Sequence, residues 1–95
     1  MFQIRFLEKA NHQLKKLEKN KTYKIQFKAV VKALAYLEQN PKHPSLKTHR
    51  YSGFSFVKKQ VFEAYAQNHT SGAYRIFWYY GENNTIVIIS ITAHP

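Results

Sequence analysis

The sequence of 95 residues contains no cysteine and no aspartate. Without cysteine it has no disulfide framework, which fits a reducing cytoplasm. His43 and His49 share one segment, but no cysteine or aspartate can complete a zinc site around them. Three glycines leave no glycine-rich phosphate loop, and no serine stands in a nucleophile elbow. Metal hydrolysis, nucleotide triphosphate binding and serine-triad chemistry therefore have no support in this sequence.

Long apolar runs are absent as well. The longest aliphatic run is IVII at residues 86–89, far short of the ~20 residues of a membrane-spanning helix. The first residues, MFQIRFLEK, lack the apolar stretch of a signal peptide. We therefore expect one cytoplasmic domain covering residues 1–95, with no membrane partner.

Acidic residues are scarce, so positive charge dominates. Fifteen Lys and Arg stand against five Glu, for a net charge of +10. This balance predicts a polyanionic partner, nucleic acid first and an acidic protein second. The lysines of the first half concentrate in one stretch with Glu18 as the single acidic residue among them, at Lys15, Lys16, Lys19, Lys21, Lys24, Lys28 and Lys32. They form either an RNA-binding surface or a solvated helical face.

Hydrophobic periodicity divides the first half into a strand and two helices. Phe2, Ile4 and Phe6 alternate with polar residues as in a short strand, and helical spacing begins near Leu7. Asn20-Lys21 interrupts the helical pattern like a hairpin turn. The second helix presents Lys24, Lys28 and Lys32 opposite its apolar stripe, and Asn40-Pro41 ends it.

In the second half of the sequence, apolar residues recur at every second position, as in strands. Residues 40–53, NPKHPSLKTHRYSG, read as an ordered irregular connection, followed by strands at residues 54–66, 73–80 and 85–92. The last of these, TIVIISIT, is apolar at nearly every position and is predicted to lie centrally beside the first strand. The sequence thus predicts an α/β (α+β) domain in the order β-α-α-β-β-β, with two helices on one face of a four-stranded, mainly antiparallel sheet. The other face is expected to form an open shallow cleft.

Arg75 is the most informative single residue. It lies in the strand GAYRIFWYY between aromatic neighbours, where a guanidinium must be paired, stacked or facing a cleft. It either serves packing, on Tyr79, Phe77 or Glu63, or contacts a ligand. His94, after the last strand, either lies free in solvent or transfers a proton near Arg75. RNA carries its own nucleophile, the 2′-hydroxyl, so a base, an acid and cations suffice to cleave it.

The element order, the loop NPKHPSLKTHRYSG, the strand GAYRIFW and the ending TIVIISITAHP resemble the RelE/ParE superfamily of bacterial type II toxins, in particular its RelE-like branch. The resemblance covers nearly the whole chain and is most specific at the two last strands. It implies an mRNA endonuclease that needs no metal or other cofactor, acts on the ribosome or on free mRNA, and is held inactive by an acidic antitoxin.

The resemblance also implies roles for particular residues. Arg75 matches the arginine that contacts the scissile phosphate, and His94 matches a catalytic basic group. Lys58 and Lys59 lie where the family supplies lysines to the cleft. Glu63 is either a general base, as in some members, or a cross-strand partner of a basic residue.

The family continues past this histidine to a tyrosine, where this chain has Pro95. Tyr65, Tyr79 or Tyr80 are candidates to replace it by stacking on a base, and Tyr79 is assigned to RNA binding with Lys24, Lys28, Lys32, Lys58 and Lys59. Two other functions remain open: a ParE-like DNA gyrase inhibitor, and a catalytically silent nucleic-acid-binding module of the same fold.

Overall fold

The computed structural model describes residues 1–68 and 71–94 as an α+β domain. Its first half contains strand β1 (Gln3–Phe6), helix α1 (Glu8–Lys19), the short 3₁₀ helix η1 (Lys21–Tyr23) and helix α2 (Lys24–Gln39). The hairpin turn falls where the sequence predicted it, because the Asn20 side chain accepts a hydrogen bond from the backbone N–H of Thr22 at 3.0 Å. Helix α2 ends at Asn40, before Pro41, as expected.

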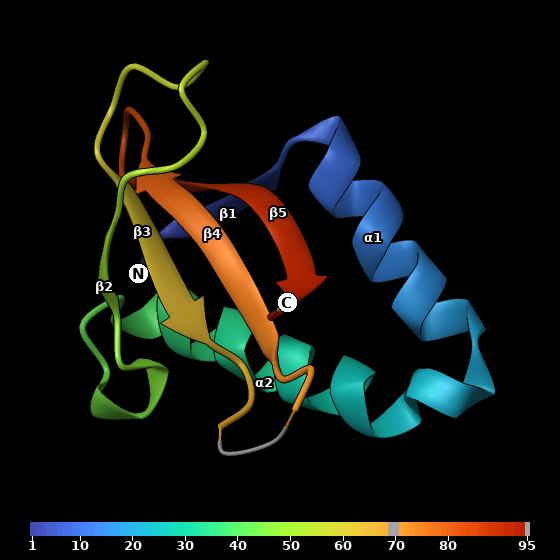
Figure 1. Cartoon of the computed structure of the whole chain (residues 1–95). Helices are drawn as coiled ribbons and strands as arrows, with labels where there is room; N and C mark the ends of the chain where they lie inside the picture. Colours follow the sequence, from blue (N-terminus) through green and yellow to red (C-terminus); the bar gives the residue numbers. More distant parts are fainter. Residues whose placement is uncertain (69–70, 95) are drawn as a thin grey trace.

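The second half contains four strands, with the 3₁₀ helix η2 (Pro44–Leu46) before them: β2 (His49–Tyr51), β3 (Val61–Tyr65), β4 (Tyr74–Tyr80) and β5 (Thr85–Ala93). The sheet has the order β1-β5-β4-β3-β2. β1 pairs with β5 in parallel, and the other pairs are antiparallel. The predicted central position of β5 is confirmed (Figure 1).

Two details of the predicted sheet are wrong. It has five strands instead of four, because residues 49–51 of the supposed irregular connection pair with β3 as an edge strand. The strand predicted at residues 54–66 begins only at Val61. Phe54 has φ +59°, and the backbone N–H of Val57 donates to the Phe54 carbonyl at 2.9 Å, so the chain turns here. Lys58 and Lys59 consequently lie in a loop and not on a strand.

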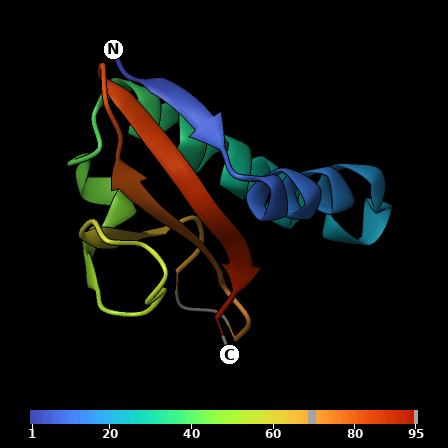
Figure 2. The same ribbon diagram turned by 90° about the horizontal axis from the view of Figure 1, so that it is seen from above.

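The two faces of the sheet are covered differently. One face packs against α1 and α2 through the main core, which includes Leu17, Val30, Leu37, Ile76 and Trp78. Figure 2 shows α2 and the segment of residues 52–60 on opposite sides of the sheet. The second face therefore carries a small aromatic cluster, in which Phe54 of that segment and Tyr51 contact Phe77 with ring centres 5.3 and 4.6 Å apart. This second cluster also includes Val61 and Ile89, so part of the face that was predicted to be open is buried.

Gly53 lies close to the Tyr51 ring. A Cβ atom at this position would overlap the outer end of that ring, so a larger residue would require the Tyr51 side chain to move.

Helix α1 supplies a hydrogen-bond acceptor to the part of the β5 edge that β1 does not pair with. The pairing of β1 with β5 ends near Phe6 and Ile88. Further along β5, the Gln13 side-chain oxygen accepts hydrogen bonds from the backbone N–H of Ile91 at 2.7 Å and from the Ser90 hydroxyl at 3.3 Å. A helix side chain thus satisfies a strand edge that β1 is too short to reach. Within the described ranges, no helix is long and apolar enough to cross a membrane.

Candidate functional site

Arg75 is the second residue of β4, the central strand of the sheet, and lies on the face away from α2. It stands opposite Tyr65 on β3 and opposite Thr92 on β5. Its guanidinium carbon lies 3.9 Å from the centre of the Tyr65 ring, so the cation stacks on that ring. The expected stacking partners, Tyr79 and Phe77, lie further along β4.

Backbone carbonyl groups fix the guanidinium on one side. Nη1 of Arg75 donates to the carbonyl oxygens of Gln67 at 3.1 Å and Ala73 at 3.3 Å, with Tyr74 at 3.5 Å. These bonds tie the arginine to the ends of β3 and β4. Together with the stacked tyrosine they allow one orientation of the guanidinium plane.

Glu63 supplies the negative charge beside Arg75. Its Oε2 lies 3.4 Å from Nε of Arg75, and the two side chains are 10% and 11% exposed. Nε makes no hydrogen bond in the described structure, so this contact is an ion pair without good hydrogen-bond alignment. The pairing with Glu63 that the sequence left open is therefore present. A buried ion pair of this kind positions Arg75, whatever else the arginine does.

His49 completes the cluster from β2. Its Nε2 lies 2.8 Å from the other carboxylate oxygen of Glu63, Oε1, and its ring meets the Tyr65 ring edge-on with centres 5.6 Å apart. We call His49, Glu63, Tyr65 and Arg75 the cleft cluster. Sequence reasoning weighed His49 only as a metal ligand. The three residues of β2 are too few to show the period of a strand, so no sequence signal could have placed His49 beside Glu63.

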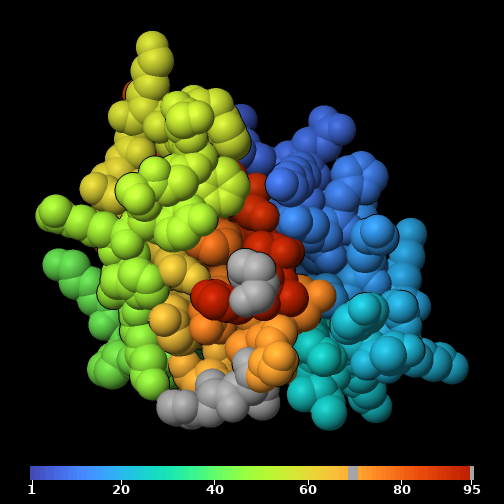
Figure 3. All heavy atoms as spheres, in the orientation of Figure 1, coloured from blue at the N-terminus to red at the C-terminus, as the bar shows by residue number. Residues whose placement is uncertain are grey.

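His94 approaches Arg75 from the opposite side. Its backbone N–H donates to the carbonyl of Ala73 at 2.8 Å, two residues before Arg75 on β4. In the space-filling view, the C-terminal end of the chain lies in the middle of this face, between the 52–60 segment and α1 (Figure 3). Pro95 lies outside the described residues. The structure thus brings the backbone of His94 next to the strand that carries Arg75.

Comparison with solved structures identifies the fold. A YoeB/ParE toxin from Agrobacterium tumefaciens superposes with a TM-score of 0.73 over 99% of this chain and 100% of its own, at 7% sequence identity. The chain has the fold of the YoeB/ParE toxins. A YoeB dimer from Staphylococcus aureus gives a TM-score of 0.68 at 17% identity, covering 99% and 98% of the two chains. No protein-family model and no curated protein matches the sequence. The resemblance to the RelE/ParE toxins is confirmed at the level of the fold.

The other predicted residues of this toxin-like fold lie outside the cleft cluster. Tyr79 shares the face of Arg75 but stands four positions along β4, beyond Phe77. Lys59 accompanies it, with Nζ 5.9 Å from the Tyr79 ring centre and 3.5 Å from the Tyr80 carbonyl. Lys58 is exposed beside them in the same loop. These three residues extend the basic and aromatic surface away from Arg75.

Lys24, Lys28 and Lys32 are exposed along α2. That helix packs against the face of the sheet opposite to the segment of residues 52–60 (Figure 2). Lys32 nevertheless lines a cavity of about 280 Å³ together with Tyr65 of the cleft cluster.

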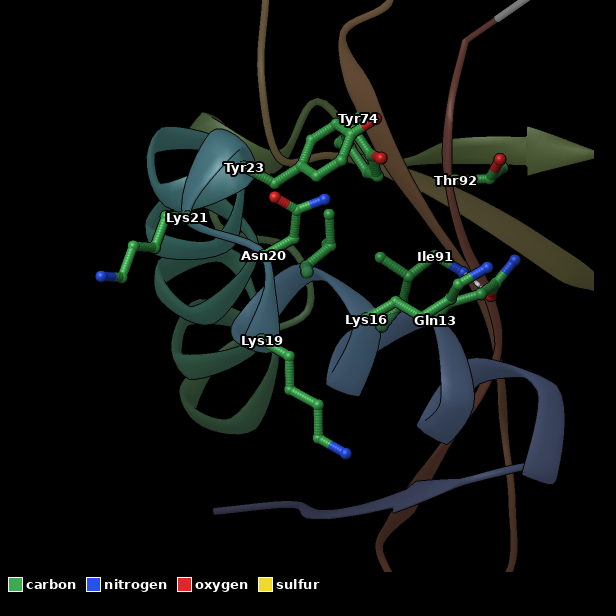
Figure 4. Close-up of a pocket in the computed structure, with 10 residues that line it drawn as sticks. Gln13, Lys16, Lys19, Asn20, Lys21, Tyr23, Tyr74, Ile91 and Thr92 are labelled. Carbon is green, nitrogen blue, oxygen red and sulfur yellow. Dashed lines mark hydrogen bonds between the residues drawn. The ribbon is translucent and has the colours of Figure 1, made fainter.

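A basic pocket of about 590 Å³ lies between α1, the helical turn and the ends of β4 and β5 (Figure 4). Leu17, Tyr23, Tyr74 and Ile91 contribute apolar surface, whereas Lys16, Lys19 and Lys21 contribute charge. Burial raises the pKa of Tyr74 above its ordinary value, with a smaller contribution from Tyr23. The hydroxyl of Tyr74 thus stays neutral near neutral pH. None of the cleft-cluster residues lines this pocket.

Proposed function

We propose that this protein is the toxin of a type II toxin–antitoxin system and acts in the cytoplasm as a metal-independent endoribonuclease that cleaves mRNA, on the ribosome. The observation that carries the proposal is the cleft cluster: one guanidinium, oriented by three carbonyl groups, a carboxylate and an aromatic ring, on the open face of a YoeB/ParE-like fold. The net charge of +10 supports a nucleic-acid substrate.

The proposed reaction uses the nucleophile of the substrate. The RNA 2′-oxygen attacks the adjacent phosphorus, the bond from phosphorus to the 5′-oxygen breaks, and a 2′,3′-cyclic phosphate and a 5′-hydroxyl remain. Arg75 stabilises the negative charge on the phosphoryl oxygens in the transition state. His94 takes the proton of the 2′-hydroxyl. The chemistry requires no metal, because the attacking oxygen is already positioned within the substrate.

Glu63 fits a positioning role better than the role of general base. A general base must reach the proton that it removes. Both oxygens of Glu63 already face basic side chains, Oε1 that of His49 and Oε2 that of Arg75. In the proposed mechanism Glu63 therefore holds the two basic side chains, while Lys58, Lys59 and Tyr79 bind neighbouring nucleotides.

The proposed inhibitor is an acidic antitoxin. The basic pocket at the end of α1 combines a lysine rim with apolar residues, which suits an acidic segment that also carries apolar side chains. A neighbouring gene for a short acidic protein whose co-expression restores growth is the genetic counterpart of this proposal.

Controlled expression in bacteria tests the function directly. We expect rapid arrest of translation, with transcripts that end in 2′,3′-cyclic phosphates when the cleaved RNA is mapped. Filamentation and an SOS response with intact transcripts would instead indicate gyrase poisoning of the ParE type. Normal growth at a verified level of folded protein would indicate a silent nucleic-acid-binding module.

The lysines of α2 give a separate expectation. Replacing Lys24, Lys28 and Lys32 together by Gln should weaken binding to ribosomal RNA and lower the slope of log affinity against log salt concentration by about 2 to 3, as expected for three phosphate contacts. Filter-binding titrations at several salt concentrations measure this slope. The matched variant with Arg at all three positions keeps the charge and should keep the slope. An unchanged slope in the Gln variant would mean that these lysines are a solvated face.

A further inference from the structure

His49 has an unusual pair of neighbours for an exposed histidine. It lies on the edge strand β2, and its side chain is 47% exposed. Nevertheless each ring nitrogen stands beside an oxygen of the protein: Nε2 is 2.8 Å from Oε1 of Glu63, and Nδ1 is 3.2 Å from the carbonyl oxygen of Lys47. The ring is therefore oriented at both nitrogens and still open to a ligand.

These neighbours determine where the protons lie. A carbonyl oxygen can only accept, so Nδ1 of His49 must donate to Lys47. At Nε2 there are two arrangements, an imidazolium that donates to an ionised Glu63 or a protonated Glu63 that donates to a neutral ring. In both, one proton lies between His49 and Glu63.

The charged groups around the ring favour placing this proton on His49. Glu63 and Tyr65 face His49 from β3, and Arg75 on β4 approaches the other oxygen of Glu63. Arg75 stabilises the ionised form of that carboxylate. An ionised Glu63 in turn stabilises the imidazolium, so His49 presents a proton at the edge of the cleft.

We propose that His49 is the proton donor of the cleavage reaction, a role that rests on the proposed nuclease function. When the bond between phosphorus and the 5′-oxygen breaks, the proton on Nε2 of His49 moves to that oxygen, and the neutral ring then regains a proton from water. A departing alkoxide is a far stronger base than the Glu63 carboxylate, so it takes the proton that His49 donates to that carboxylate in the free protein.

The arrangement of the strands supports this assignment. Across the sheet, His49 on β2 lies on one side of Arg75, and the backbone of His94, after β5, lies on the other. The attacking and leaving oxygens stand on opposite sides of the phosphorus in such a displacement. A phosphate bound at Arg75 would thus have a base on the side of His94 and an acid on the side of His49.

A substrate with a sulfur leaving group tests the assignment. At a cleavage position mapped with the parent protein, the 5′-oxygen is replaced by sulfur, because a thiolate leaves without being protonated. His49→Ala should slow cleavage of the ordinary RNA by about 10²- to 10⁴-fold, the usual contribution of general acid catalysis, but should slow cleavage of the 5′-thio RNA by less than tenfold. His94→Ala should slow both, and His12→Ala, which removes an exposed histidine of α1, should slow neither.

Each other result overturns the proposal. An equal loss on both substrates would show that His49 acts through the structure of the site and not as the acid. No loss on the ordinary RNA would show that the reaction does not use His49. A folded parent that cuts neither substrate would overturn the nuclease function and this role with it. Nitrogen NMR of the free protein adds a readout independent of activity, because a neutral ring with its proton on Nε2 would contradict the assigned bond from Nδ1 to Lys47.

Discussion

Replacing Arg75 by Ala should reduce RNA cleavage by about 10²- to 10³-fold, the effect of removing one oriented donor from a developing oxyanion. In bacteria the same substitution should abolish growth arrest. The expectation follows from the geometry of the site. Three carbonyl groups accept hydrogen bonds from Nη1, Glu63 lies beside Nε, and the Tyr65 ring stacks on the guanidinium. The contacts described leave Nη2 as the terminal nitrogen that a phosphate can use.

Arg75→Lys should restore little of the activity. A lysine keeps the charge, but its three donors share a single nitrogen, so the same group cannot bind the carbonyls of the strand ends and a phosphate in a fixed fork. An activity within threefold of the parent in the Lys variant would show that charge alone matters at this position. Quantitative mapping of cleaved transcripts, with circular dichroism to verify folding, measures both variants.

Arg50→Ala is the matched control. Arg50 lies on β2 and is exposed, opposite Phe62 on β3, and so points to the other face of the sheet from His49. Its loss changes the net charge by the same amount as the loss of Arg75. If the two Ala variants lose activity equally, the effect comes from the overall charge, and the site assignment is wrong.

The elements that carry a strong local signal were predictable from the sequence. The helices follow from apolar spacing and from the proline after Asn40. The nearly continuous apolar run of β5 indicates a strand covered on both faces, and this pattern predicts that β1 lies beside it. The change from strand β1 to helix α1 near Leu7 was likewise predictable, because the apolar residues change there from alternation to helical spacing.

The segment of residues 52–60 was misread for a physical reason. Phe54 and Phe56 alternate with polar residues, which imitates the period of a strand. In the structure, Phe54 satisfies its hydrophobic contact by folding back on Phe77, at a positive φ that propensity does not predict. Phe56 is 71% exposed, so the alternation predicted neither an extended backbone nor burial of both rings. For this reason Lys58 and Lys59 were placed on the wrong kind of element.

The cleft cluster was only half predictable. Arg75 stood out because a cation within an aromatic strand requires a partner, and Glu63 was among its possible partners. The role of His49 depends on the register by which β2 pairs with β3, where His49 stands directly opposite Glu63. Register between segments far apart in the chain follows from tertiary packing, and the three-residue β2 is too short to show a period of its own.

Glu63 gives the largest expected effect on stability. Replacing it by Leu should lower the free energy of unfolding by about 3–5 kcal/mol, because the substitution leaves the buried guanidinium of Arg75 without its counter-charge. The side chains of both residues are about nine-tenths buried. Urea unfolding followed by tryptophan fluorescence measures the change, with Trp78 buried in the main core as the reporter. Glu82→Leu, at an exposed turn, should change stability by at most about 0.5 kcal/mol.

The double variant Glu63→Leu, Arg75→Leu separates an ion pair from a simple packing defect. Removing both charges eliminates the unpaired cation, so the double variant should recover most of the stability that the single Glu63 variant loses, as when a buried pair is replaced by apolar residues of similar volume. If the two losses simply add, the charges are not coupled, and the 3.4 Å contact between them contributes nothing to the fold. In that case Glu63 would be free to act on a substrate, and its assignment as the group that positions Arg75 and His49 would have to be abandoned. The recovery should be confined to stability, because the double variant still lacks the guanidinium that the proposed cleavage requires.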